Sequence, residues 1–509
     1  MKTLLPLLLS AALLPALASA QSRADYQVHY APRLSQEGLR VQVSVRLPRA
    51  ADSTSFHYAS HVWGEDNLQR CLTGLAGENP QYRFRLVPDS SRVVVYHPHG
   101  KSVRFSYRVK QDQPRYNEQV FNRPYVADTY FHVLGESLFM VPESALRGPE
   151  PDPEFAADIR WVGFPAGYTL HNTLSPGATE QRFRGKVWTQ FYRSLYVGGD
   201  YRIHRLPCRN NVVHVALRGQ WQVYDEPKLL SLLQNAIVAQ RDFWRDHKAD
   251  YFSVVMSPTV TSTDTGSHVV SMKGAGLHQG FVLQSTNNPY NNWDMLRYMF
   301  NHEMMHPWMG GQIATAHEEL NYWFTEGFTD YYALKNRLRS GDLTFDQWLK
   351  AFNSDVIRRL YNNPQRNQPN YLIKDNYWQN PSFAKLPYRR GALFAFWLDN
   401  RILRKSNYTR SLDDLMRELL QACRQPGQQF TDERFLALAQ RYLNEDISYA
   451  FQKYVLHGVD LPLDPAGLME GLTVDTSGPA PVVKATAPAE VLQARYLTSP
   501  PAAKPVAAQ

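Results

Sequence analysis

The amino-terminal part of the chain alternates hydrophobic and polar residues with a period of two. Residues 41–47 read Val-Gln-Val-Ser-Val-Arg-Leu, and residues 103–109 read Val-Arg-Phe-Ser-Tyr-Arg-Val. This alternation is typical of half-buried β-strands, and Pro48 and Gly100 indicate turns. The pattern therefore predicts an antiparallel β-sandwich over residues 21–224.

The spacing of hydrophobic residues changes near residue 225. Leu229, Leu233 and Ile237 fall on one face of a helix, so residues 225–470 are expected to form a mixed and then mainly helical second domain. Residues 471–509 contain few aromatic residues and are rich in Pro, Ala, Val and Thr, which predicts a disordered tail. The predicted fold class is α+β with several domains, as expected for 509 residues.

The first residues have the three parts of a secretory signal peptide. A short start with Lys2 precedes an apolar run from Leu4 to Leu17, and Ala-Ser-Ala occupies positions 18–20. We therefore expect residues 1–20 to be removed and the protein to be periplasmic or extracellular. No later stretch approaches the roughly 20 apolar residues of a membrane span, so integral membrane association is not expected.

Composition and charge narrow the classes of partner. Hydrophobic residues make up 43% and charged residues 20% of the chain, as in folded proteins. The formal net charge is +8, but the basic residues form no dense block, which argues against nucleic-acid binding. Three cysteines allow at most one internal disulfide, and Cys71 with Cys208 is the expected pair. The oligomeric state is left open.

The sequence His-Glu-Met-Met-His at residues 302–306 carries the clearest chemical signal. His302 and His306 are four residues apart, so on a helix both imidazoles can reach one metal ion while Glu303 faces a bound water. A second helical stretch places Glu326 on an otherwise apolar face. A buried lone carboxylate is costly and favours a nearby cation.

Two imidazoles and one carboxylate predict one zinc ion per chain with a fourth position open for water, the arrangement of a catalytic site. Glu303 is then the expected general base for hydrolysis of a peptide bond in a peptide or protein substrate. Asp330 follows Glu326 by one helical turn, which suits a carboxylate that accepts a hydrogen bond from His302 and fixes its tautomer.

Residues 302–308 and 323–332 together resemble the gluzincin metallopeptidases, above all the glycyl aminopeptidase family, with features similar to aminopeptidase N. The resemblance implies a thermolysin-like zinc catalytic domain behind an amino-terminal β domain, with aminopeptidase-like activity. Residues 387–393, Pro-Tyr-Arg-Arg-Gly-Ala-Leu, are similar to the family segment that carries an oxyanion-stabilising tyrosine, which implies this role for Tyr388. Relatives often continue into a PDZ-type domain, which we do not expect here.

Residues 274–279, Gly-Ala-Gly-Leu-His-Gln, correspond to the substrate-binding strand of the family. The resemblance implies that the glycines, including Gly276, let a substrate backbone pair with this strand. His278 occupies the position of the glutamate that holds the substrate α-ammonium in relatives, and a histidine supplies no fixed negative charge. Glu318 or Glu319 could replace that glutamate.

Three functions therefore stay open at this stage. The first is an exported zinc metallopeptidase of aminopeptidase type. The second is a zinc endopeptidase or other zinc hydrolase without specificity for a free amine. The third is a non-catalytic peptide-binding protein with the same fold. The full set of catalytic residue types favours an enzyme over the third.

Overall fold

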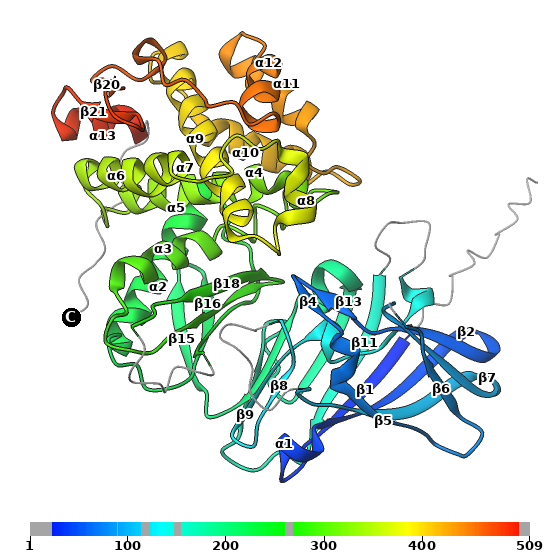
Figure 1. Cartoon of the computed structure of the whole chain (residues 1–509). Coiled ribbons are helices and arrows are strands. Elements are labelled where there is room, and N and C mark those ends of the chain that lie inside the picture. Colours follow the sequence, from blue (N-terminus) through cyan, green and yellow to red (C-terminus); the bar gives the residue numbers. More distant parts are fainter. Residues whose placement is uncertain (1–22, 89, 113–121, 147–153, 260–267, 498–509) are drawn as a thin grey trace, which may run out of the picture.

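The computed structural model describes residues 23–88, 90–112, 122–146, 154–259 and 268–497 (Figure 1). The expected signal peptide lies outside these residues. The described chain is an α+β protein with more than one domain, as predicted. Figure 1 shows the β-sheets of the amino-terminal domain to one side and the helix-rich second domain to the other.

The described part of the amino-terminal domain contains two large sheets and one two-stranded hairpin. The eight-stranded sheet has the order β13-β11-β1-β2-β7-β5, with β10 beside β2 and β6 beside β7. Its strands are β1 (Arg23–His29), β2 (Leu39–His57), β5 (Leu72–Gly77), β6 (Arg83–Leu86), β7 (Arg92–Val109), β10 (Val141–Pro142), β11 (Glu154–Val162) and β13 (Glu180–Lys186). The four-stranded sheet has the order β12-β14-β9-β8. Its strands are β8 (Tyr125–Val126), β9 (Tyr130–Leu134), β12 (Thr169–Asn172) and β14 (Leu195–Gly199).

The period-two residues lie where the pattern predicted. Residues 41–47 and 103–109 form the paired strands β2 and β7, with Val43 opposite Phe105. Their hydrophobic side chains point inward and share one core with Phe131 and Tyr196 of the smaller sheet. Among the described strands of these two sheets, all pairs are antiparallel except β1 with β11, which is parallel. Alternation alone does not encode strand direction.

Short elements complete this domain. They are α1 (Leu34–Glu37), the hairpin strands β3 (His61–Val62) and β4 (Glu65–Asp66), and the single turns η1 (Leu68–Cys71), η2 (Gly135–Ser137), η3 (Glu143–Ala145) and η4 (Val187–Phe191).

The predicted domain boundary near residue 225 is wrong. Strands β15 (Arg202–Cys208) and β16 (Asn211–Leu217) belong to the second domain, in a five-stranded sheet of order β15-β16-β17-β19-β18. The other strands are β17 (Phe252–Pro258), β18 (Met272–Leu277) and β19 (Gly280–Ser285). The first domain therefore ends at about Gly199. The strands of the first domain and strands β15 and β16 share the same period of two. This period does not reveal the sheet to which a strand belongs.

Helices of the second domain pack against this five-stranded sheet. Helix α2 begins at Glu226, as predicted, where the Asp225 side chain accepts a hydrogen bond from the Lys228 amide. The longer helices are α2 (Glu226–Trp244), α3 (Trp293–Glu303), α5 (Gly327–Arg339), α9 (Pro381–Lys405), α10 (Leu412–Cys423) and α11 (Asp432–Leu443). The shorter ones are α4 (Tyr322–Thr325), α6 (Phe345–Ala351), α7 (Arg359–Tyr361), α8 (Ile373–Asn376), α12 (Ser448–Phe451) and the turns η5 (Glu319–Asn321), η6 (Phe352–Arg358), η7 (Asn370–Leu372), η8 (Gln452–Leu456) and η9 (Pro465–Gly467). Helix α3 packs between β18 and α5, and α5 packs on α9 (Figure 1).

The predicted disordered tail over residues 471–509 is also wrong for most of its length. The chain forms β20 (Leu472–Asp475), β21 (Val482–Ala485) and helix α13 (Ala489–Leu497). Tyr496 is fully buried, and its hydroxyl shares a hydrogen bond with Tyr331 of α5. A few well-placed hydrophobic residues are sufficient to dock this segment on an existing core, which its overall composition conceals. Residues 498–509 lie outside the described part.

The expected disulfide between Cys71 and Cys208 is absent. All three cysteines lie in the described part of the chain, are buried and form no disulfide bond. Cys71 belongs to the first domain, whereas Cys208 lies in the core of the second. Among the described helices, none combines the length and the apolar content that a bilayer crossing requires.

Candidate metal centre

The two histidines of the His-Glu-Met-Met-His sequence meet at the carboxyl end of α3. Asn292 caps the other end of this helix by accepting a hydrogen bond from Met295 N at 2.8 Å. The helix ends at Glu303, before His306, and the next residues continue in tight turns in which His306 N donates to Glu303 O at 3.3 Å. The two Nε2 atoms still lie 3.3 Å apart, because these turns keep the backbone nearly helical.

Glu326 completes the group from the junction of α4 and α5. Its Oε2 lies 3.3 Å from His302 Nε2 and 3.8 Å from His306 Nε2. One ligand atom from each of the three residues lies within 4.8 Å of the others. Two nitrogens and one oxygen in this arrangement suit Zn²⁺ bound by three protein side chains.

The remaining ring nitrogens are already engaged. His302 Nδ1 lies 2.9 Å from Asp330 Oδ1, and His306 Nδ1 lies 3.2 Å from the Met309 carbonyl. Each Nδ1 can therefore carry the proton and donate it, which leaves each Nε2 free to coordinate a metal ion placed between the two rings and Glu326. Sequence reasoning expected the contact of Asp330 with His302 but not that of Met309 with His306.

Asp330 is itself held by two residues that the sequence analysis missed. Tyr298 donates a hydrogen bond to its Oδ1, and Arg389 Nη1 donates to its Oδ2 at 2.7 Å. Tyr298 precedes His302 by one turn of α3, and Arg389 directly follows Tyr388, so both positions were adjacent to recognised motifs. Asp330 is fully enclosed, with its carboxylate fixed on both oxygens.

The ionisation of the group reflects a concentration of negative charge. Burial opposes a charge on His302, but Asp330 and Glu326 outweigh burial and raise its pKa to about 10. Burial likewise opposes the charge on Asp330, yet the His302 hydrogen bond and Arg389 hold its pKa at about 2. A buried site with several carboxylates around two imidazoles attracts a cation.

Glu303 faces the same space from the end of α3. Burial raises the pKa of its carboxyl group, while the two imidazoles lower it. Its Oε2 is buried and has no hydrogen-bond partner among the described residues. Buried polar atoms are nearly always paired, so this oxygen is placed for a partner that the protein itself does not provide, such as a water molecule.

Strand β18 crosses directly over these residues and is the edge strand of its sheet. A Cβ added at Gly274 would meet the Glu303 carboxylate, and one added at Gly276 would meet Cβ of His306, both closer than 3.0 Å. Side-chain contacts at such distances are essentially never observed. The glycines are therefore needed for close packing on the metal centre, a reason that sequence reasoning did not find.

His278 lies in the turn between β18 and β19, where its backbone N–H donates to Arg193 O at 2.7 Å. Burial lowers the pKa of its side chain to about 4, so the imidazole is neutral near pH 7. The Arg193 guanidinium stacks on Trp63 and lies 3.6 Å from Glu318. The turn after β18 thus carries a neutral histidine, and the carboxylate of Glu318 pairs with an arginine.

Tyr388 reaches the centre from α9. Its ring is nearly parallel to that of His302, with centroids 6.0 Å apart, and its hydroxyl lies 3.0 Å from the hydroxyl of Tyr377. Helix α9 approaches closely because Gly391 meets Gly327, the neighbour of Glu326, and any Cβ at either glycine would clash with backbone. This glycine contact brings the helix that carries Tyr388 close to the segment that carries Glu326.

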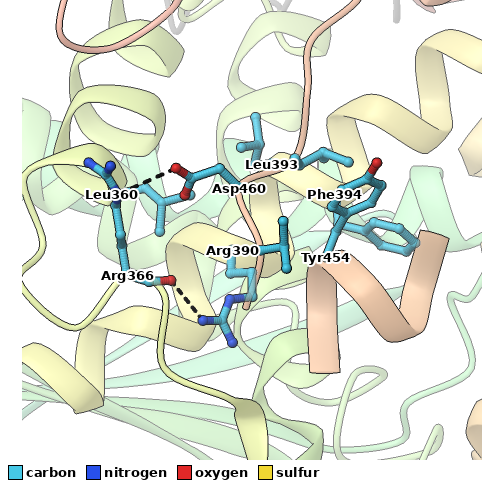
Figure 2. A pocket seen from close by; sticks show the side chains of 9 residues that line it. Leu360, Arg366, Arg390, Leu393, Phe394, Tyr454 and Asp460 are labelled. Carbon is cyan, nitrogen blue, oxygen red and sulfur yellow. Dashed lines mark hydrogen bonds and ion pairs between the residues drawn. The ribbon is translucent and has the colours of Figure 1, made fainter. Parts of the chain in front are cut away.

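A separate small pocket is lined in part by residues of α9 (Figure 2). Arg390 is one of the charged residues that line this pocket. The Arg390 guanidinium donates hydrogen bonds to the carbonyls of Val455, Arg366 and Gln368. Arg366 in turn pairs with Asp460 at 3.5 Å. These interactions join α9 to neighbouring loops. The charged side chains of this pocket are therefore paired within the protein and stabilise its structure.

No protein-family model and no curated protein matches this chain. Solved structures do resemble it in fold. An aminopeptidase N family protein from Idiomarina loihiensis superimposes with a TM-score of 0.72 at 15% identity, over 89% of this chain and 79% of that chain. An M1 zinc metallopeptidase from Deinococcus radiodurans gives a TM-score of 0.54 at 14% identity, over 87% and 96%. A mutant of it described as bound to a Tyr-Ser-Ala substrate gives 0.53 at 14%, over 88% and 98%.

The chain thus has the fold of aminopeptidase N-like zinc metallopeptidases. This agrees with the fold implied by its resemblance to the gluzincins.

Proposed function

We propose that this protein is an exported zinc metallopeptidase with one zinc ion held by His302, His306 and Glu326. The observation that carries the proposal is the meeting of two Nε2 atoms and a carboxylate oxygen beside the unpaired, buried oxygen of Glu303. The fold shared with zinc peptidases supports it. A protein that only bound peptides would have no use for a buried base at this position.

The side chains divide the work of hydrolysis. When bound, zinc supplies a Lewis acid that polarises the scissile carbonyl and acidifies a water molecule. Glu303 accepts the proton of the attacking water and delivers it to the leaving amine. Tyr388 donates a hydrogen bond to the oxyanion of the tetrahedral intermediate. Asp330 holds the His302 ring in the tautomer that presents Nε2.

The substrate is proposed to add as a strand along the outer edge of β18. Main-chain hydrogen bonds then hold the peptide, and the glycines of β18 bring its backbone near the metal centre. Binding of this kind is independent of side-chain sequence, which suits a peptidase of broad specificity. In the Deinococcus protein, the named tripeptide substrate is consistent with short peptides as a substrate class.

The neutral His278 favours a second candidate, a zinc peptidase without a strict need for a free amine. A neutral imidazole offers no charge to anchor an α-ammonium, and Glu318 is already paired with Arg193. We therefore expect that blocking the amino terminus of a peptide weakens cleavage only modestly. A complete requirement for a free amine would instead support the aminopeptidase.

One experiment tests the proposal and separates the candidates. The purified protein is analysed for zinc and incubated with a peptide mixture in free and amino-blocked forms, with and without a chelator. About one zinc per chain and chelator-sensitive cleavage support a zinc peptidase. Absence of turnover over the whole mixture would refute it in favour of a binding protein.

Export rests on residues 1–20 and is tested separately. A chain that begins with these residues should lose them and appear outside the cytoplasm of a bacterial host, whereas a chain lacking them should stay inside. Retention of the uncut full chain in the cytoplasm would contradict export without affecting the peptidase proposal.

A further inference from the structure

Tyr377 lies beside Tyr388 and plays no part in the reaction as described so far. It follows α8, and its hydroxyl lies 3.0 Å from that of Tyr388. Both residues are half-buried, and desolvation of the hydroxyls raises the pKa of each well above the usual value. Both hydroxyls are therefore neutral, and each has one proton to donate.

The direction of the hydrogen bond between them decides what Tyr388 can do. A phenol has a single proton, so Tyr388 can donate to an oxyanion and keep its bond to Tyr377 only if its oxygen accepts that bond. If the bond ran the other way, the proton of Tyr388 would point away from the substrate. We propose that Tyr377 donates to Tyr388 and thereby directs the Tyr388 proton toward the oxyanion.

The surroundings of Tyr377 hold its ring in place. Its backbone N–H donates to Ile373 O at 2.8 Å, and its ring packs against Tyr322 with centroids 4.4 Å apart. The neighbouring Trp378 packs against Gly64, in the β3–β4 hairpin of the first domain. Tyr377 is thus held by its backbone hydrogen bond and by Tyr322, as expected for a residue that positions another side chain.

Tyr377 is therefore a positioning residue that acts through Tyr388, and this inference rests on the proposed peptidase function. A donor to the Tyr388 oxygen also polarises its O–H bond, since linked hydrogen bonds strengthen one another. The benefit arises when charge develops on the substrate oxygen. The expected effect is on kcat rather than on KM.

The test is a double-mutant cycle with Tyr377→Phe and Tyr388→Phe. Tyr377→Phe should lower kcat about tenfold, the scale of one hydrogen bond, with KM, zinc content and Tm close to the original values. In the Tyr388→Phe background, Tyr377→Phe should have no further effect on kcat. Tyr322→Phe removes the neighbouring hydroxyl but keeps the ring contact with Tyr377, and it should retain full kcat.

Two results would overturn the inference while the peptidase stands. One is an unchanged kcat in Tyr377→Phe, and the other is an equal loss in the presence and absence of the Tyr388 hydroxyl. If the unmodified protein cleaves no peptide, the proposed function fails and this inference fails with it.

Discussion

The close passage of β18 over the metal centre predicts that Gly276→Ala disables the site. The added Cβ would lie closer than 3.0 Å to Cβ of His306, whereas ordinary contact begins at 3.4 Å. Both atoms are attached directly to the backbone, so no side-chain rotation can relieve the clash. Either β18 or the turn that carries His306 must move by several tenths of an ångström or more.

Such a shift exceeds what a metal centre tolerates. Functional groups must be held within roughly 0.5 Å of their productive geometry, and a misplacement of about 1 Å can reduce the rate about a hundredfold. We expect Gly276→Ala to lower kcat/KM by ten- to a hundredfold, on the order set by that comparison. Overpacking should also lower the free energy of unfolding by about 1–3 kcal/mol.

Two matched variants separate the causes. Gly274→Ala meets the carboxylate end of Glu303, which can rotate, so it should lower kcat while keeping zinc. A Cβ at Gly467 meets nothing within 4 Å, so Gly467→Ala should behave like the original protein. Zinc content, kcat/KM and thermal unfolding are measured for all three. Full zinc and unchanged kcat/KM in Gly276→Ala would refute the packing argument.

Three further changes test other parts of the account. Asp330→Asn should weaken zinc binding about 10- to 100-fold in chelator competition. The control Asp294→Asn, at an exposed position, should bind zinc as the original protein does. If Asp330→Asn bound zinc as tightly as the original protein, the role of the carboxylate would be contradicted. Tyr496→Ala should lower the free energy of unfolding by about 3–5 kcal/mol in a urea titration, and a change under about 0.5 kcal/mol would show that α13 is dispensable. Burial opposes the charge on Asp413, but Arg339 and Lys335 hold its pKa at about 2, below the ordinary value of 3.8. The stability it contributes should therefore be present above about pH 4 and decline as the pH falls toward 2, and Asp413→Asn should flatten this part of the urea midpoint curve.

The candidate ligands could be found from the sequence because they lie in short, regular segments. A spacing of four residues brings His302 and His306 together even though α3 ends between them. Glu326 and Asp330 are separated by one turn, which places both on the side of the histidines. Local periodicity was sufficient here, and it also gave the α+β class and the start of α2.

Features that depend on packing between distant segments could not be read in the same way. Strands β15 and β16 have the alternation of the first domain but pair with β17 of the second. The final segment looks poorly folded by composition, yet the single aromatic ring of Tyr496 docks against Tyr331 and Lys335. No pattern along the chain encodes these contacts.

The candidate site also combines residues that local sequence patterns predict with residues that only tertiary packing brings together. Tyr298 and Arg389 contact Asp330, and Tyr377 contacts Tyr388. The chain contains many tyrosines and arginines, and only the three-dimensional structure shows which of them lie beside the predicted site residues. Gly276 was expected to serve the substrate, whereas its tight contact with His306 became visible only when β18 and α3 were placed together.

The central claim is that Glu303 is the base of a zinc centre whose ligands are His302, His306 and Glu326. The most direct test is zinc content and peptide turnover measured on the same preparation of Glu303→Ala. We predict about one zinc per chain, as in the original protein, with kcat reduced at least about a hundredfold. Loss of the metal, or turnover close to that of the original protein, would contradict it.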